Sequence, residues 1–482
     1  MVTATFGLPG RWVFFATAGL ALMMFSIDAT IVAVALPGMT RDLQTSLAWI
    51  GWTLTAYALA QTVMMPLAGK LAESFGRMRV FFACVVVFTL GSLLCALAPS
   101  VYALILFRVV QALGGGGLMP SAVGIVAQEF PQTRARMVGL FMSIFPVGGI
   151  IGPNLGGFIV QHWSWRECFY INLPLGLIAM LALFRRARQS EQTKRRRIDF
   201  GGTVLFAVGI VSLLCAITFL GEDPGYWRTP QFWVLLAVSA LFLVAFVLFE
   251  RRIADPILDP TLVVQNPFLA VNVYSFMFGA CVFGFFSFIP YYAQVQYGMS
   301  PLESGAVLTP RSIAMMLTST VSSFMLLRYG YRRPMIAGLS LVVLTLFILS
   351  RDLQRLSLGG FEIGPFLLLA GPVALSGIGL GLAGPASNNA ALDLVPEKAA
   401  SITGIRGLFR STGGVLGTAI FVLILELSPD KGAGLRSIFG VLSFVLLCTI
   451  PIVFMIPDTA RERRQRDRAA ARTAPAEAHG GE

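Results

Sequence analysis

The chain has 482 residues, of which 56% are hydrophobic and 12% are charged. Soluble proteins carry about 25% charged residues, so this composition excludes an ordinary soluble domain and indicates an integral membrane protein with many spans. The formal net charge of +12 would also suit a nucleic-acid-binding protein. It is explained better by the loops of a membrane protein that hold it, and we expect no nucleic-acid partner.

Apolar windows of about 20 residues, the length that crosses a bilayer, occur fourteen times along the chain. The first contains Asp28 and has no evident small-residue cleavage site, so we expect a retained span rather than a signal peptide. The predicted spans are 12–36, 48–68, 80–98, 101–124, 137–160, 168–184, 200–220, 231–249, 268–290, 303–327, 334–350, 363–390, 404–426 and 437–456.

The distribution of basic residues predicts the orientation of these spans. With the N-terminus inside, the predicted cytoplasmic segments hold 25 of the 36 Lys and Arg residues, the outer segments hold 7 and the spans hold 4. Because basic residues accumulate in cytoplasmic loops, this split predicts a cell (inner) membrane protein with both termini in the cytoplasm. The basic runs then act as topology anchors near anionic lipid.

Eight glycine and proline positions recur 265 residues later in the chain. Since these residues mark special backbone geometry, we expect two halves with one backbone plan and the same orientation. Parallel repeats of this kind are typical of alternating-access transporters, whose substrate site lies between the halves. The recurring pairs are Gly114/Gly379, Gly116/Gly381, Pro120/Pro385, Pro131/Pro396, Gly139/Gly404, Gly148/Gly413, Gly149/Gly414 and Gly152/Gly417. The predicted parts are an N-terminal six-helix half (1–184), a basic cytoplasmic loop with two inserted helices (185–267), a C-terminal six-helix half (268–456) and a cytoplasmic tail (457–482).

The segment "GKLAESFGRMR" lies between the second and third spans. Its glycines turn the chain, while Glu73 can cap a helix N-terminus or pair with Arg77 or Arg79. A plain basic loop is the alternative. The segment resembles the G-x-L-x-D-x-x-G-R-x-R loop of the major facilitator superfamily, with Glu73 in place of the usual Asp. The resemblance implies a gating loop formed by Gly69, Glu73, Gly76, Arg77 and Arg79.

The fourth span carries Arg108 and Gln111, which share a helix face because they are three residues apart. A charge near the bilayer centre costs at least about 2.5–3.5 kcal/mol, so Arg108 needs a partner or a wet cavity. Asp28 lies roughly 12 Å below the outer end of its span and Arg108 roughly 10 Å below that of its own. Burial and a neighbouring guanidinium act in opposite directions on the protonation of a carboxyl group. We therefore predict that Asp28, Arg108 and Gln111 couple protons to transport; a static buried ion pair is the alternative.

Other polar side chains are candidates for the wall of a substrate cavity. Such a wall is otherwise expected to be apolar and aromatic, as in permissive binding sites. Arg311 lies in the tenth span at a depth similar to that of Arg108 and is expected to face the same cavity. The candidates are Gln61, Asn172 and Arg311.

The fifth span contains "GGIIGPNLGG", in which Gly148, Gly152 and Gly156 share one face. Small residues at this spacing let a neighbouring helix approach closely, and Pro153 is expected to bend the helix. The segment resembles the G-x-x-x-G-P-x-x-G-G antiporter signature of the major facilitator superfamily, which marks exporters. The predicted hinge and seal comprises Gly148, Gly152, Pro153, Gly156 and Gly157, with Gly413 and Gly417 from the second half.

Three more stretches, "IDATIVAVALP", "WRECFYINLPLG" and "RSTGGVLGTA", are similar to segments of the fourteen-span drug–proton antiporters of the EmrB/QacA type. The resemblance covers essentially the whole chain. It implies an all-α integral membrane protein with the major facilitator fold and fourteen transmembrane helices. The outer loop "LSPDKGAGLR" is short, whereas members that dock a periplasmic adaptor often carry a longer one, so an adaptor partner is not favoured.

The predicted function is proton-coupled export of small amphipathic or cationic compounds by alternating access, with the proton gradient in place of a cofactor. The chain has no P-loop, and its two histidines and six scattered cysteines form neither a metal motif nor a catalytic triad, so we expect no enzyme. One alternative is a dedicated proton-coupled exporter of one metabolite, siderophore or toxin. A membrane sensor that does not transport is the alternative from another class.

Overall fold

The computed structural model describes residues 8–189, 200–253, 266–351, 356–358, 361–394 and 399–458, and almost all of them are helical. A short antiparallel hairpin connects two of the helices. The elements in chain order are α1 (Leu8–Asp42), α2 (Leu47–Phe75), α3 (Arg77–Ala96), α4 (Val101–Glu129), η1 (Pro131–Thr133), α5 (Arg134–Met142), α6 (Ile144–His162), α7 (Glu167–Tyr170), α8 (Asn172–Gln189), α9 (Phe200–Glu222), η2 (Tyr226–Arg228), α10 (Pro230–Glu250), α12 (Phe268–Tyr297), α13 (Pro301–Ala306), α14 (Thr309–Tyr329), α15 (Arg332–Leu349), β1 (Leu356–Leu358), β2 (Phe361–Ile363), α16 (Pro365–Leu392), α17 (Ala399–Leu427) and α18 (Lys431–Phe454).

Local sequence explains several helix ends. The Ser46 and Ser100 hydroxyls accept hydrogen bonds from backbone N–H groups in the first turns of α2 and α4, which satisfies donors that a helix start leaves free. Ser300 and Glu303 form a reciprocal capping box at the start of α13. Gly298 ends α12 in the left-handed conformation, with φ of 62°, which glycine adopts without steric cost.

Twelve helices among the described residues are long and apolar enough to cross a membrane. They coincide with twelve of the fourteen predicted spans. The other two predicted spans, 48–68 and 303–327, coincide with α2 and with α13–α14, which are helical but are not among those twelve. The all-helical membrane architecture is therefore confirmed, while the count of fourteen spans stays a prediction.

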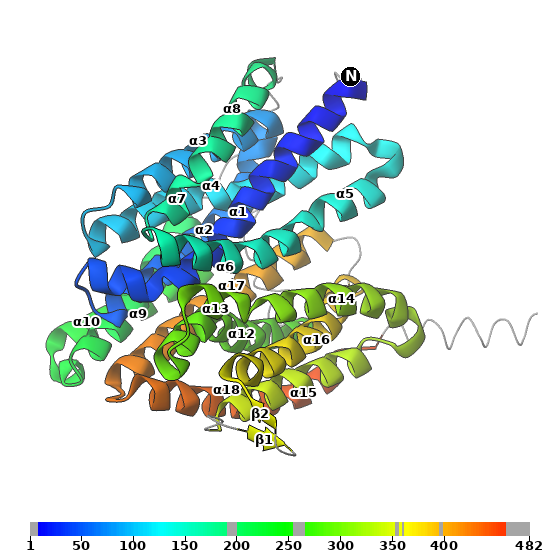
Figure 1. Ribbon diagram of the computed structural model, residues 1–482. Coiled ribbons are helices and arrows are strands. Elements are labelled where there is room, and N and C mark those ends of the chain that lie inside the picture. The colour runs from blue at the N-terminus through cyan, green and yellow to red at the C-terminus, as the bar shows by residue number, and fades with distance from the viewer. Residues whose placement is uncertain are drawn as a thin grey trace, which may run out of the picture.

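The helices form two groups, one from each end of the chain (Figure 1). In the first group α1 packs against α6 and α8, and α4 packs against α2 and α3. In the second group α12 packs against α17 and α18, and α16 packs against α14 and α15. Helices α9 and α10 pack on each other, and α9 also contacts α17 and α2.

Contacts between the two groups lie toward the end of α1 that is remote from the N-terminus. Gln294 of α12 donates a hydrogen bond to the backbone carbonyl of Val34, 3.3 Å away. Gly157, near the end of α6, packs against the backbone of α13, and Gly51, near the start of α2, packs against α17. The interface between the groups is thus closed at this end.

Candidate functional site

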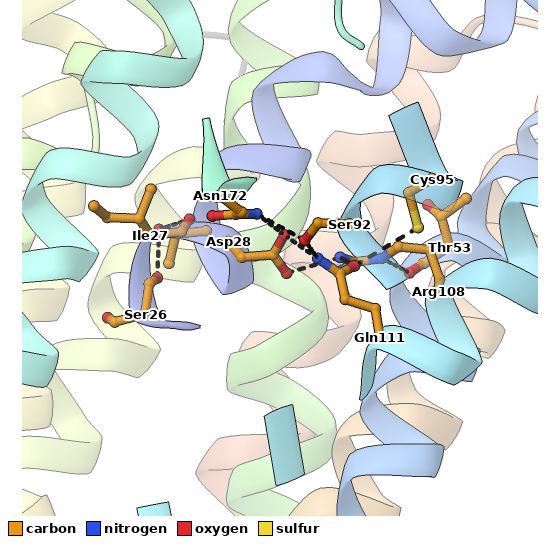
Figure 2. Close-up of polar contacts among 10 residues, drawn as sticks. Ser26, Ile27, Asp28, Thr53, Ser92, Cys95, Arg108, Gln111 and Asn172 are labelled. Carbon is orange, nitrogen blue, oxygen red and sulfur yellow. Dashed lines mark hydrogen bonds and ion pairs between the residues drawn. The ribbon is translucent and has the colours of Figure 1, made fainter. Parts of the chain in front are cut away.

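A buried polar cluster surrounds Asp28 in the middle of α1 (Figure 2). The Asp28 and Arg108 side chains are 0% and 1% exposed, and Arg108 Nη1 lies 2.8 Å from Asp28 Oδ2. Gln111 Nε2 and Asn172 Nδ2 donate to Asp28 Oδ1 over 2.8 and 3.1 Å. Three N–H donors therefore converge on one carboxylate that is sealed from solvent.

Ser92 of α3 completes this arrangement. Its hydroxyl oxygen accepts hydrogen bonds from Gln111 Nε2 at 2.6 Å and from Asn172 Nδ2 at 3.1 Å. We call Asp28, Ser92, Arg108, Gln111 and Asn172 the Asp28 cluster. Because its members come from α1, α3, α4 and α8, a change at the carboxylate reaches four helices at once.

The Arg108 guanidinium is held from several sides. Its Nε donates to the Thr53 carbonyl of α2 over 3.2 Å, and Nη1 also donates to Gln111 Oε1 over 2.6 Å. The Tyr57 ring lies beneath it, with 3.8 Å between the guanidinium carbon and the ring centroid, a favourable cation–π distance. Arg108 thus keeps partners on α2 and α4 that do not depend on Asp28.

The pairing of Asp28 with Arg108, which the sequence suggested from depth alone, is present in the structure. Gln111 lies on the same helix face and contacts both. Asn172, a candidate for the substrate wall, instead belongs to the Asp28 cluster, where it is 1% exposed. Ser92 and Tyr57 were not predicted from the sequence, because an uncharged serine or tyrosine in a membrane span does not require a polar partner as a charged residue does.

The two remaining wall candidates lie elsewhere. Gln61 is half-buried on α2, with its backbone against Gly116 of α4. Arg311 of α14 stacks on Phe286 of α12, with 3.6 Å between its guanidinium carbon and the ring centroid. Its buried Nε has no hydrogen-bond partner among the described residues. Neither side chain belongs to the Asp28 cluster.

The predicted glycine face of α6 packs directly on α1. A Cβ added at Gly148 would lie 2.6 Å from the Ser26 Cβ, and one at Gly152 would lie 2.0 Å from the Thr30 hydroxyl oxygen. Real Cβ atoms essentially never come this close to another atom. The two helices can therefore approach to this distance only with glycine at these positions.

The other end of the motif contacts the second group of helices. A Cβ at Gly157 would lie 2.5 Å from the Pro301 carbonyl oxygen, and one at Gly305 would lie 2.1 Å from the Pro153 carbonyl oxygen. Asn154 Nδ2 donates to the Thr309 hydroxyl over 2.5 Å. The motif thus lies between α1 and the partner half, which suits the predicted seal.

The second half repeats these contacts. A Cβ at Gly413 would lie 2.1 Å from the Phe276 carbonyl oxygen, and one at Gly417 would lie 2.2 Å from that of Ala280. The α17–α12 pair therefore uses the same close approach as α6–α1. Pro153 lies inside the helix α6, and the bend expected there stays a prediction.

The residues of the predicted gating loop connect four helices, α2, α3, α4 and α8. Gly76 joins α2 to α3 with φ of 92°, a conformation that favours glycine. Arg77 Nη1 donates to the Gly124 carbonyl of α4 over 2.8 Å, and Arg79 Nε donates to the Ala187 carbonyl of α8 over 3.4 Å. The side chain of Glu73 and the surroundings of Gly69 lie outside the described residues.

The corresponding loop of the second half contains no acidic residue of its own, but Asp458, which follows α18, lies against it. Gly330 has φ of 76°, and the next N–H, of Tyr331, donates to Asp458 Oδ1 over 2.7 Å. Arg332 donates to the carbonyls of Phe454 and Ile456, each over 2.9 Å. The end of α18 is thereby anchored to this loop.

No group of three His, Cys, Asp or Glu residues that could hold a metal ion occurs in the part of the chain that the structure describes. The features described so far define a class of protein: a multi-pass helical membrane protein of two similar helix groups, with a buried ion pair in one of them.

Comparison with known proteins gives the family. The model of the Major Facilitator Superfamily matches residues 18–418 and 273–479. The multidrug transporter protein MdtP of Bacillus subtilis is 33% identical over 85% of this chain and 74% of its own length. The tetracenomycin C resistance and export protein of Streptomyces glaucescens is 31% identical over 89% of this chain and 80% of its own length.

Solved structures share the fold at lower sequence identity. The nucleoside transporter NupG superposes with a TM-score of 0.66 at 13% identity, covering 93% of this chain and 100% of NupG. The peptide transporter POT in complex with sulfate gives 0.67 at 16% identity, covering 94% of this chain and 97% of POT.

The chain belongs to the Major Facilitator Superfamily. It is therefore a membrane transporter rather than an enzyme. The resemblance to this superfamily is confirmed, while the fourteen-span EmrB/QacA subtype stays a prediction.

Proposed function

We propose that the protein exports small amphipathic compounds across the cell membrane in exchange for protons. The observation that carries this proposal is the Asp28 cluster, which puts an ionisable carboxyl in the membrane interior beside a guanidinium. Intramembrane ionisable residues of this kind mark ion and proton pathways. The names of the relatives, which are multidrug transporters and resistance proteins, support efflux of drug-like compounds.

The geometry suggests how a proton could drive the cycle. The two Asp28 oxygens accept three N–H donors, and the negative charge of the carboxylate strengthens each of these hydrogen bonds. Proton binding removes that charge and would therefore weaken the hydrogen bonds of Arg108, Gln111 and Asn172 to Asp28. Since these side chains belong to α4 and α8, protonation would loosen α1 from its neighbours.

The glycine motif of α6 would connect protonation of Asp28 to the opening and closing of the interface between the halves. Helix α6 packs on α1 through Gly148, Gly152 and Gly156, and on the partner half through Gly157. If both termini are cytoplasmic, the closed end of the interface between the halves faces outward. Movement of α1 after protonation would then be transmitted through α6 to this outer seal, which is the alternation that transport needs.

A transport assay tests this proposal. Wild-type protein in proteoliposomes should accumulate ethidium against its gradient when a pH difference is imposed, and should stop when the difference is collapsed. One pH unit corresponds to about 1.4 kcal/mol per exchanged proton and therefore to about tenfold accumulation. Equal ethidium uptake with and without the pH difference would contradict proton coupling.

A dedicated exporter of one compound is the second candidate. The relative from Streptomyces glaucescens is named for resistance to and export of one compound, tetracenomycin C. A competition screen separates the two candidates, because a dedicated exporter would move one chemical family whereas a multidrug exporter would move several unrelated cations and amphiphiles. The short loop between α17 and α18 does not favour an adaptor partner.

The orientation of the chain gives a further prediction. The loop around Gln192 contains four of the basic residues that predict a cytoplasmic location, at 194–197. A cysteine introduced at Gln192 in a cysteine-free background should resist a membrane-impermeant maleimide in intact cells and react after permeabilisation. A cysteine introduced at Gly225, between α9 and α10, is the control and should react in intact cells. Labelling at Gln192 in intact cells would overturn the predicted topology.

A further inference from the structure

A second polar site lies in the C-terminal group of helices. A cavity of about 300 Å³ is lined by α12, α16 and α17, and its size is at the lower limit of small-molecule sites. The residues that bear on its chemistry are Tyr274, Phe278, Ser387, Asn388, Arg406 and Arg410. We call this space the arginine cavity. No member of the Asp28 cluster lines it.

The arginine cavity carries two positive charges on one side. Arg406 and Arg410 are four residues apart on α17, so they share a helix face, where like charges destabilise the helix. None of the described residues that line the cavity is acidic. In the described ranges, neither guanidinium has an ion-pair partner. An arginine within a membrane span otherwise pairs with an acid or with oxygen atoms in a wet cavity.

Some N–H donors of Arg406 have hydrogen-bond partners and its Nε has none among the described residues. It donates through Nη1 to Asn388 Oδ1 over 2.9 Å and through Nη2 to Ser387 Oγ over 3.0 Å. Its buried Nε has no partner among the residues that the structure describes. These two bonds fix the plane of the guanidinium and leave a donor unused. Arg410 lines the same cavity, and its side chain is open to it.

The shared backbone plan does not require these charges. Gly148 of α6 and Gly413 of α17 make equivalent contacts in the two halves. In the same alignment, Arg406 and Arg410 take the places of Phe141 and Phe145 in the first half. One half therefore builds the same helix pair with phenylalanine. The arginines are specific to the other half.

The carboxylate of the Asp28 cluster, by contrast, is specific to the first half. The backbone carbonyls nearest the paired glycines are those of Met23 and Ile27 in the first half and of Phe276 and Ala280 in the second, so Asp28 aligns with Cys281. Where the first half has a carboxylate to balance its arginine, the second half has a cysteine at the equivalent position and two arginines that no described acid balances.

We propose that the arginine cavity binds the anionic group of an amphipathic ligand, which is a carboxylate, sulfonate or phosphate. Guanidinium groups bind such oxyanions through paired N–H donors, and Phe278 and Tyr274 would contact the apolar part of the ligand. The anion can belong to a soluble organic acid or to a phospholipid headgroup. That the ligand is an exported substrate rests on the function proposed above, whereas the binding itself does not.

Binding of radiolabelled naphthoate to the full-length protein in nanodiscs tests the proposal. In discs of phosphatidylcholine alone, unlabelled naphthoate should displace the label at a concentration at least about tenfold lower than its uncharged methyl ester, because a charge-assisted hydrogen bond contributes about a factor of ten or more. The Arg406→Gln/Arg410→Gln double variant should lose this preference. Arg410→Lys should retain part of it, and Arg228→Gln, in the loop between α9 and α10, is the matched control.

A second set of discs separates the two sources of the anion. If phosphatidylglycerol in the discs displaces naphthoate from wild-type protein and from Arg228→Gln, the lipid headgroup occupies the cavity. If it does not, the site selects a soluble acid. Equal displacement by naphthoate and its ester, or unchanged acid binding in the double variant, would overturn the proposal. Should the double variant fail to fold, the comparison of Arg410→Gln with Arg410→Lys decides.

The outcome is independent of the ethidium assay. Proton-driven ethidium uptake without acid-selective binding would refute the anion site and leave the proposed function intact. Acid-selective, arginine-dependent binding in a protein that shows no proton-driven transport would support the anion site and refute the proposed function.

Discussion

Asp28→Asn is expected to abolish proton-driven ethidium accumulation in proteoliposomes. The amide has nearly the same volume as the carboxyl group but cannot take up a proton, so the gradient no longer performs work on the substrate. For a pH difference of one unit, the accumulation ratio should fall from about ten to about one. Counterflow of ethidium across the same vesicles reports whether the protein still cycles.

Loss of the carboxylate also leaves the buried Arg108 without its ion pair, which can cost about 3–5 kcal/mol of stability. The Asp28→Asn/Arg108→Gln variant removes both charges and should recover stability without recovering accumulation. Glu426→Gln is the matched control, because Glu426 is also a poorly exposed acid in an ion pair, 3.4 Å from Lys431 Nζ, but lies outside the Asp28 cluster. Wild-type accumulation in a folded Asp28→Asn protein would rule out Asp28 as the proton carrier.

Gly152→Leu is expected to stop transport while the protein still inserts into the membrane. Insertion should not suffer because the substitution makes α6 more apolar. The new side chain, however, starts 2.0 Å from the Thr30 hydroxyl oxygen and 2.9 Å from the Ile27 carbonyl oxygen. Overpacking of this kind costs about 1–3 kcal/mol, which shifts an equilibrium between two access states by about 5- to 150-fold. The ethidium uptake rate should fall accordingly.

The neighbouring Gly149 supplies the control for this experiment. A Cβ added there meets no atom within 4 Å, so Gly149→Leu should transport at a rate close to that of wild type. Gly417→Leu should resemble Gly152→Leu, because its Cβ would lie 2.2 Å from the Ala280 carbonyl oxygen. Equal transport by Gly152→Leu and Gly149→Leu would mean that close packing of α6 on α1 is not needed for the cycle.

The sequence predicted those features that the membrane makes costly. A charged residue in a span needs a partner, and matching depths were enough to bring Asp28 and Arg108 together. The glycine face of α6 was also predictable from spacing alone. Its partners, α1 on one side and α13 on the other, required the packing of the helices.

The arginine cavity could not be predicted from the sequence alone. Arg406 and Arg410 are two of the four basic residues within the predicted spans, but their spacing does not reveal that Asn388 and Tyr274 come to the same place from two other helices. Nor does a lone asparagine reveal its orientation. Asn172 was expected on a substrate wall and instead donates to Asp28.

Proton release on substrate binding tests the coupling role of Asp28 most directly. Purified protein in weakly buffered detergent solution, mixed with ethidium, should release protons that a pH-indicator dye detects, because in the proposed exchange substrate binding is coupled to loss of the proton from Asp28. The Asp28→Asn variant should bind ethidium, as measured by fluorescence, without releasing protons. Proton release of equal size from wild type and from Asp28→Asn would contradict the account.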